Sequence, residues 1–255
     1  MPPDLFRLDG RTAWITGGTK GLGFQMAGAL AAAGAAIALN SRHADEAESA
    51  ARNLAELHGI RAFGGGADVA NEGEVNSFVQ RANDALGPID ILVANAGINI
   101  RKPTVEQTSA DWDAVVATNL TGPFLCSRAV LPQMIARGWG RIIHVASMLG
   151  LVGLAGRPSY SATKGALVLL AKTQALEVAS HGVTVNALCP GPFGTEMNKP
   201  LLNDPKKYAD FVARIPVGRW GEMTEIEGPI LFLASNASSF MTGASLVVDG
   251  GWTAQ

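Results

Sequence analysis

Short apolar runs alternate with longer segments of helical periodicity along nearly the whole chain. We expect strands at residues 13–16, 36–40, 61–64, 89–94, 141–146, 183–188 and 246–249. We expect helices at residues 24–33, 45–57, 72–85, 111–136, 159–179 and 224–233. Several strand runs are continuously apolar, such as Ile91-Leu92-Val93-Ala94, which is typical of parallel strands covered on both faces. The alternation predicts an α/β fold with a doubly wound, mostly parallel sheet and right-handed crossovers.

No segment of the chain has the composition of a linker, so we expect residues 1–255 to form a single domain. The 30 glycines fit many short turns between strands and helices, given that 47% of the residues are hydrophobic. The net charge of −2 gives no indication of a nucleic acid or an anionic membrane surface as a partner. No continuous apolar run approaches the ~18 residues needed to span a bilayer.

The N-terminus and the cysteines favour a cytoplasmic location. Met1-Pro2-Pro3-Asp4 lacks a basic region followed by an apolar stretch, so secretion is not expected. Cys126 and Cys189 show no C-x-x-C spacing and are expected to be buried thiols in a reducing compartment. The four histidines have no metal-ligand spacing among them, so we expect no metal site.

The segment 16–23, Thr-Gly-Gly-Thr-Lys-Gly-Leu-Gly, joins the first expected strand to the first expected helix. A strand that turns through glycines into a helix N-terminus presents backbone N–H groups and a positive dipole end at one point, which suits a pyrophosphate. A tight strand–helix connection without a ligand is the other interpretation of such a turn. The residues of this turn expected to bind a nucleotide are Gly17, Thr19, Lys20, Gly21, Leu22 and Gly23.

Ser147, Tyr160 and Lys164 have the spacing of an acid–base site. Positions i and i+4 of a helix share a face, so the Lys164 ammonium is expected close to the Tyr160 phenol. A fixed cation there favours the phenolate and lowers the pKa of the phenol toward the range of a general acid or base. Ser147 could then hold a carbonyl oxygen beside the same phenol. Taken alone, the Tyr–Lys pair could also be a tyrosine packed beneath a lysine stem.

These motifs occur in one order with Asn95-Ala96-Gly97, Asn119, Pro190-Gly191 and Thr195, and the whole set resembles the short-chain dehydrogenase/reductase family. The resemblance covers residues 8–252 and includes every motif of that set. It implies a Rossmann-type sheet of seven mostly parallel strands in the order 3-2-1-4-5-6-7, with helices on both faces. It also implies hydride transfer between a nicotinamide cofactor and a carbonyl or secondary alcohol, in a single dinucleotide-binding and catalytic domain that is usually a homotetramer.

The same resemblance assigns roles to individual residues. Tyr160 is the general acid in reduction and the general base in oxidation, Lys164 also binds the nicotinamide ribose, and Ser147 orients the substrate carbonyl. Asn119 holds a water that links the lysine to solvent. Residues 193–215 are a polar stretch of sequence with few apolar side chains, and we expect them to form an irregular lid over the substrate. The remaining residues implied to bind the cofactor are Asp68 and Val69 at the adenine, Asn95, Ala96 and Gly97 below the ribose, and Pro190, Gly191 and Thr195 at the nicotinamide.

The residues at the end of the second expected strand favour NADP(H), with NAD(H) possible. Sites that prefer NAD place an acid there to bind the ribose 2′-hydroxyl. Here the strand ends in Asn40-Ser41-Arg42, and no acid occurs before Asp45. Ser41 leaves room for a phosphate, Arg42 can pair with it, and Lys20 adds a second positive charge. As an alternative, Arg42 is only an exposed loop residue.

The segments 214–221 and 248–252 are similar to those of bacterial sugar-acid dehydrogenases such as gluconate 5-dehydrogenase and 2-deoxy-gluconate 3-dehydrogenase. The expected substrate residues are therefore Ser147, Tyr160 and Arg157, and Arg157 or Arg101 could bind a substrate carboxylate. Both arginines could equally be solvated loop residues. Sugar-acid members often carry an acid at the position of Ser41, which this chain lacks. The alternatives are a 3-oxoacyl-thioester (acyl carrier protein) reductase and a non-catalytic nucleotide-binding regulator of the same fold.

Overall fold

Seven parallel strands form one sheet in the order β3-β2-β1-β4-β5-β6-β7, which confirms the expected fold. The computed structural model describes residues 3–195 and 204–254. The strands are β1 (Thr12–Thr16), β2 (Ala36–Ser41), β3 (Ala62–Gly66), β4 (Ile91–Ala94), β5 (Gly140–Val145), β6 (Val183–Pro190) and β7 (Ser245–Val248). The strand order reverses between β1 and β4, and in such sheets ligands bind beyond the carboxyl ends of the strands at that point.

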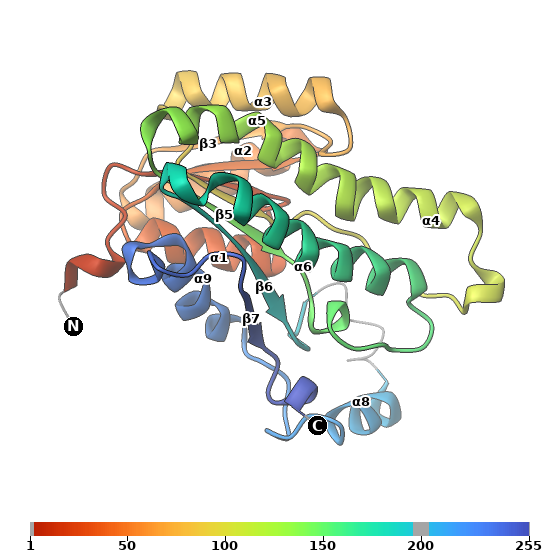
Figure 1. Ribbon diagram of the computed structural model, residues 1–255. Coiled ribbons are helices and arrows are strands. Elements are labelled where there is room, and N and C mark those ends of the chain that lie inside the picture. Colours follow the sequence, from red (N-terminus) through yellow and green to blue (C-terminus); the bar gives the residue numbers. More distant parts are fainter. Residues whose placement is uncertain (1–2, 196–203, 255) are drawn as a thin grey trace.

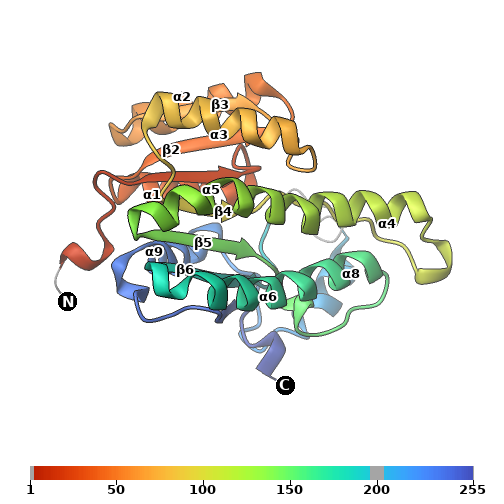
Figure 2. The same ribbon diagram turned by 45° about the horizontal axis from the view of Figure 1, so that its top comes forward.

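Helices cover both faces of the sheet, as Figures 1 and 2 show. The helices α1 (Gly21–Ala32), α2 (Ala44–His58) and α9 (Glu227–Ala234) pack on one face. On the other face lie α3 (Glu72–Leu86), α5 (Gly122–Arg137) and α6 (Pro158–Val178). The apolar strand β4 explains why two layers are needed. Leu92 and Ala94 point into the α3/α5/α6 layer, whereas Ile91 and Val93 point into the α1/α2/α9 layer, because successive side chains of a strand face opposite sides.

The long helix expected at residues 111–136 is divided into two. Helix α4 (Ser109–Val116) begins with a capping box between Thr108 and Asp111, and a π-helical turn (Ala117–Thr121) separates it from α5. Within the described part of the chain, Ser109–Arg137 is the one stretch with the length and mean hydropathy of a membrane span. Its most apolar window is 44% buried, and side chains such as Cys126 and Val130 lie fully in the core.

The segment expected to be an irregular lid contains a helix, α8 (Pro205–Val212), so the expected irregular conformation was wrong for these residues, while the role of a lid stays a prediction. The sequence pattern was misleading because the helix is short and largely polar. Two aromatic side chains of α8 attach it to the rest of the fold: Tyr208 stacks on Trp220, and Phe211 packs against both Trp220 and Trp252. Residues 196–203 of the expected lid lie outside the described residues.

Candidate functional site

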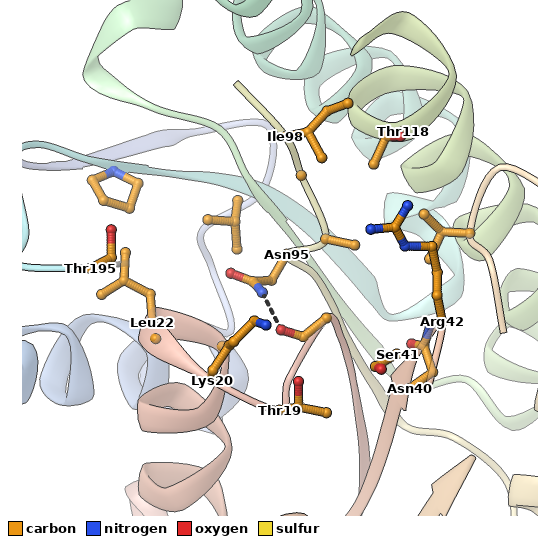
Figure 3. Close-up of a pocket in the computed structure, with 18 of the residues that line it drawn as sticks. Thr19, Lys20, Leu22, Asn40, Ser41, Arg42, Asn95, Ile98, Thr118 and Thr195 are labelled. Carbon is orange, nitrogen blue, oxygen red and sulfur yellow. Dashed lines mark hydrogen bonds between the residues drawn. The ribbon is translucent and has the colours of Figure 1, made fainter. Parts of the chain in front are cut away.

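A cavity of about 430 Å³ lies at the carboxyl edge of the sheet, where the strand order reverses. Figure 3 shows Leu22 and Thr195 on one side of this pocket and Ser41 and Arg42 at the end of β2 on the other. The structure brings every residue expected to bind the cofactor to its lining. These residues are Gly17, Thr19, Lys20, Gly21, Leu22, Gly23, Ser41, Arg42, Asp68, Val69, Asn95, Ala96, Gly97, Tyr160, Lys164, Pro190, Gly191 and Thr195.

The glycine turn before α1 has the conformation and the close contacts that only glycine permits. Gly17 and Gly21 have φ angles of +59° and +58°, in the left-handed region. A Cβ on Gly23 would lie 2.5 Å from Nδ2 of Asn95. That amide nitrogen donates to the carbonyl oxygens of Thr16 and Gly17 at 3.0 and 3.2 Å, which fixes the turn against the segment after β4. The turn therefore leaves bare backbone at the start of α1, and its shape and dipole suit the pyrophosphate of a dinucleotide.

Ser147, Tyr160 and Lys164 lie together at the inner end of the pocket. Ser147 follows β5, while Tyr160 and Lys164 come from the first two turns of α6. The Ser147 hydroxyl is close enough to the Tyr160 phenol to lower its pKa. The Lys164 ammonium lies 5.6 Å from the centroid of the Tyr160 ring and donates to the carbonyl oxygen of Val145 at 2.6 Å. A phenol, a hydroxyl and an ammonium thus line the same part of the pocket, and these are the groups needed to move a proton to or from a bound oxygen.

The charges around Tyr160 differ from those that the sequence suggests. Burial raises the pKa of the Tyr160 phenol, and the hydrogen bond from Ser147 and the charges of Arg157 and Arg101 partly oppose that rise. Lys164, expected to lower the pKa of Tyr160, is not among the groups that shift that pKa here, and its ammonium donates to the carbonyl oxygen of Val145. Burial also lowers the pKa of Lys164 to about 8.

Asn119 lies in the π-turn and does not line the pocket, although its neighbour Thr118 does. Its fully buried amide binds the backbone of Ile98: Oδ1 accepts from the Ile98 N–H at 2.8 Å, and Nδ2 donates to the Ile98 carbonyl at 2.9 Å. Nδ2 also donates to Oγ1 of Thr163 on α6 at 3.3 Å. Asn119 therefore joins the loop after β4 to the helix that carries Tyr160 and Lys164.

At the outer end of the pocket, Arg42 is exposed and its guanidinium turns toward the cavity (Figure 3). Asp68 is a turn cap, since its Oδ1 accepts from the Ala70 N–H at 2.9 Å, and it also lines the pocket. Sequence reasoning missed nine lining residues: Asn40, His43, Glu46, Ala67, Ile98, Thr118, Val145, Ala146 and Phe193. Most of these lie at strand ends beside residues that were identified, so their position alone could have indicated them.

Arg101 and Arg157 do not line the cavity, but both are half-buried and act electrostatically on Tyr160. Burial lowers the pKa of each guanidinium, and the charge of Arg101 lowers the pKa of Arg157 further. Arg157 makes no side-chain hydrogen bond or ion pair with any residue in 3–195 or 204–254. Two guanidinium groups thus approach one another and the phenol, although burial and like charge both oppose it. Among the described residues, no cluster of histidine, cysteine and carboxylate side chains could hold a metal ion.

Comparison with known proteins agrees with this geometry. A family model described as enoyl-(acyl carrier protein) reductase matches residues 17–253. The chain is 40% identical over 252 residues to a gluconate 5-dehydrogenase of Gluconobacter oxydans (strain 621H), with 98% of each chain covered. It is also 40% identical to a 5-keto-D-gluconate 5-reductase of Escherichia coli (strain K12), with 97% of each covered.

Among solved structures, the chain is similar to a gluconate 5-dehydrogenase from Burkholderia cenocepacia J2315 in complex with NADP and tartrate. That similarity has a TM-score of 0.96 at 41% identity and covers 100% of both chains. The family model, the two relatives and the shared structure all span nearly the whole sequence. The chain therefore belongs to the short-chain dehydrogenase/reductase family.

Proposed function

We propose that this chain is an NADP(H)-dependent oxidoreductase that interconverts a secondary alcohol and a ketone of a sugar acid. The observation that carries the choice of substrate is the pair of half-buried guanidinium groups, Arg101 and Arg157, beside Tyr160. Relatives that act on gluconate or 5-keto-D-gluconate support the same choice. A bound NADP(H) would supply or accept the hydride, and the residues of the pocket supply the rest.

Tyr160 is proposed to donate a proton to the carbonyl oxygen in reduction and to remove it from the alcohol in oxidation. Ser147, which lies beside that phenol on the pocket wall, would hold the same substrate oxygen and fix its position. Because burial raises the pKa of Tyr160, the protonated phenol predominates at neutral pH, which favours the role of acid. Lys164 would turn from Val145 to the ribose of the cofactor and then lower the pKa of the phenol.

Asn119 is proposed to act by positioning the residues around it. A Cβ built on Gly97 would lie 3.3 Å from Oδ1 of Asn119 and 3.7 Å from Nζ of Lys164, so both groups border the same small space. Oδ1 has one lone pair left after accepting from Ile98. It could therefore hold a water that carries protons between Lys164 and solvent.

The carboxylate of the substrate is proposed to lie between Arg101 and Arg157. An anion there would relieve the repulsion between the two guanidinium groups and give Arg157 a partner. A 3-oxoacyl thioester of acyl carrier protein is the alternative, and a 3-oxoacyl-(acyl-carrier-protein) reductase of Aquifex aeolicus is among the relatives, at 35% identity. Such a substrate carries no carboxylate near its ketone and would leave Arg157 without an anionic partner. Initial rates with gluconate-type acids, acetoacetyl thioesters and neutral diketones, each with both cofactors, would distinguish the two.

Arg157→Gln provides the matched test of the carboxylate site. It should raise KM for the acid substrate by about 10- to 100-fold, as expected when a charge-assisted hydrogen bond is lost. It should change KM for a neutral diketone little. Equal effects on both substrates would contradict the carboxylate site.

Tyr160→Phe tests catalysis itself. The variant loses only the hydroxyl, so turnover should fall by about 10²–10⁴-fold while cofactor affinity changes little. Retention of most turnover would refute the mechanism. Stoichiometric NADPH binding by the unaltered protein without turnover on any substrate of the panel would favour a nucleotide-binding regulator.

We further propose a cytoplasmic homotetramer. Several large apolar side chains are exposed on helices that otherwise pack in the core, with 42–86% of their surface accessible. They are Trp112 on α4, Phe124 on α5, and Leu169 and Leu176 on α6. Leu167, two residues before Leu169 and therefore on the opposite side of α6, is buried, so α6 has one face for the core and another for a partner. The reduced state expected of Cys126 and Cys189, both buried, supports the compartment. Light scattering at micromolar concentration should give four times the mass of one chain, and a monomer would refute the assembly.

A further inference from the structure

The outer end of the pocket carries an acid that the sequence pattern did not indicate. Helix α2 begins at Ala44, two residues after Arg42, and its first turn contains Asp45 and Glu46. Only one of these two acids reaches the cavity: Glu46 lines it together with Arg42 and His43, whereas Asp45 does not. Glu46 thus places a carboxylate on the wall of the pocket, although the position of Ser41 has none.

Among the described residues, neither Arg42 nor Glu46 has a partner that neutralises its charge. Glu46 and Arg42 are both exposed, and neither side chain makes a hydrogen bond or an ion pair with any residue in 3–195 or 204–254. A carboxylate and a guanidinium on one pocket wall that do not pair with each other are both available to a ligand. A phosphate would be attracted by Arg42 and repelled by Glu46, whereas a ribose hydroxyl could donate to Glu46.

We propose that Glu46 is a cofactor-specificity residue that weakens binding of a 2′-phosphate and accepts a hydrogen bond from the ribose hydroxyls of NAD(H). This rests on the proposed binding of NADP(H) in the same pocket. Arg42 then sets the preference for the phosphorylated cofactor, and Glu46 limits that preference. The site is consequently able to use NAD(H) as a second cofactor, although the position of Ser41 has no acid.

Asp45 offers a matched control for Glu46. Both acids lie in the first turn of α2, whose N-cap residue His43 makes no side-chain hydrogen bond to the helix. Each therefore stabilises the exposed helix N-terminus to a similar degree. Glu46→Gln and Asp45→Asn remove the same charge from the same turn, but only the first alters the pocket wall.

The test is a titration of the whole protein with NADPH and with NADH, followed by the fluorescence of the reduced nicotinamide and without substrate. Glu46→Gln should tighten NADPH binding by about two- to fivefold, as expected when an exposed like charge is removed. It should weaken NADH binding or leave it unchanged, and the NADPH effect should shrink at high salt. Asp45→Asn should leave the ratio of the two affinities unchanged.

The outcomes separate this inference from the proposed function. If the unaltered protein binds neither cofactor, the proposed function is wrong. If it binds NADPH but Glu46→Gln changes the affinity ratio no more than Asp45→Asn does, the role of Glu46 is refuted and the proposed function stands. A tightening of NADPH alone in Glu46→Gln supports the inference.

Discussion

Acidification from pH 7 to pH 5 should destabilise this protein through one buried histidine. His144 lies on β5 with no exposed surface, and its Nε2 lies 2.8 Å from Oε1 of Gln174 on α6. Its Nδ1 has no hydrogen-bond partner among the described residues. A proton added there would be a buried donor without an acceptor. Burial lowers the pKa of His144 from 6.5 to about 4, and the positive charge of Lys164 contributes in the same direction.

The sign and size of the effect follow from that shift. Because the folded pKa is about 4 and the unfolded value is 6.5, the unfolded chain binds the proton more readily between these values. The contribution of neutral His144 to the stability of the fold is therefore fully present above pH 6.5 and is lost as the pH falls toward 4. Integration between pH 7 and pH 5 gives a loss of about 2 kcal/mol from this one residue. A loss of that size is a sizeable part of the stability of a typical domain.

The assay is urea unfolding at pH 7, 6 and 5. In the double variant His144→Leu/Gln174→Leu an apolar pair replaces the hydrogen-bonded pair, so the free energy of unfolding should fall by about 2 kcal/mol less over this range. His181→Gln, which removes an exposed histidine, should keep the pH dependence of the unaltered protein. The carboxyl groups of Asp111 and Glu225 have pKa values of about 2, so they affect the free energy of unfolding mainly below pH 5 and do not obscure the effect of His144. Equal pH dependence in the double variant and the unaltered protein would refute the reasoning.

Three further predictions concern the site. Arg42→Ala should weaken NADPH binding by about 10- to 100-fold and leave NADH binding nearly constant, as measured by titration; equal loss for both would make Arg42 a loop residue only. Asn119→Ala leaves the N–H and carbonyl of Ile98 unpaired and should cost about 2–4 kcal/mol in urea unfolding, and an unchanged midpoint would contradict the role of this amide. Gly191→Ala places a Cβ 2.5 Å from Cα of Asp249 and should cost about 1–3 kcal/mol and weaken binding of both cofactors, whereas full affinity would show that the contact relaxes.

The fold could be predicted from the sequence because its signals are local. The apolar strands, such as Ile91–Ala94, and the amphipathic helices between them are each visible within a few residues. The break in the helix after Val116 was not predicted. Gly122-Pro123, at the start of α5, could have indicated a second helix there. The π-turn itself depends on the contact of Asn119 with Ile98, 21 residues away in sequence, which no local pattern shows.

The candidate site, like the fold, could be predicted from the sequence only in part. Gly17, Asn95, Ser147 and Pro190 were placed together because each follows a strand of one parallel sheet. The charges that act on Tyr160 were not predicted. The spacing indicated Lys164, but burial is the largest influence and Arg101 and Arg157 approach from other loops. Such contacts depend on how segments far apart in the sequence pack together, and the spacing of residues along one helix gives no information about that.

The π-turn between α4 and α5 has a consequence for the evolution of this chain. Each residue of a helix turns the side chains that follow by about 100°. Inserting a further residue into 117–121 would therefore rotate α4 away from α6, on which it packs (Figure 1). The ion pair between Asp111 of α4 and Lys102 of the loop after β4, 2.7 Å long, would be lost with that contact. Deleting one residue would instead convert the π-turn to an ordinary helical turn and keep α4 nearly in phase with α5. This segment should therefore accept a deletion of one residue more readily than an insertion.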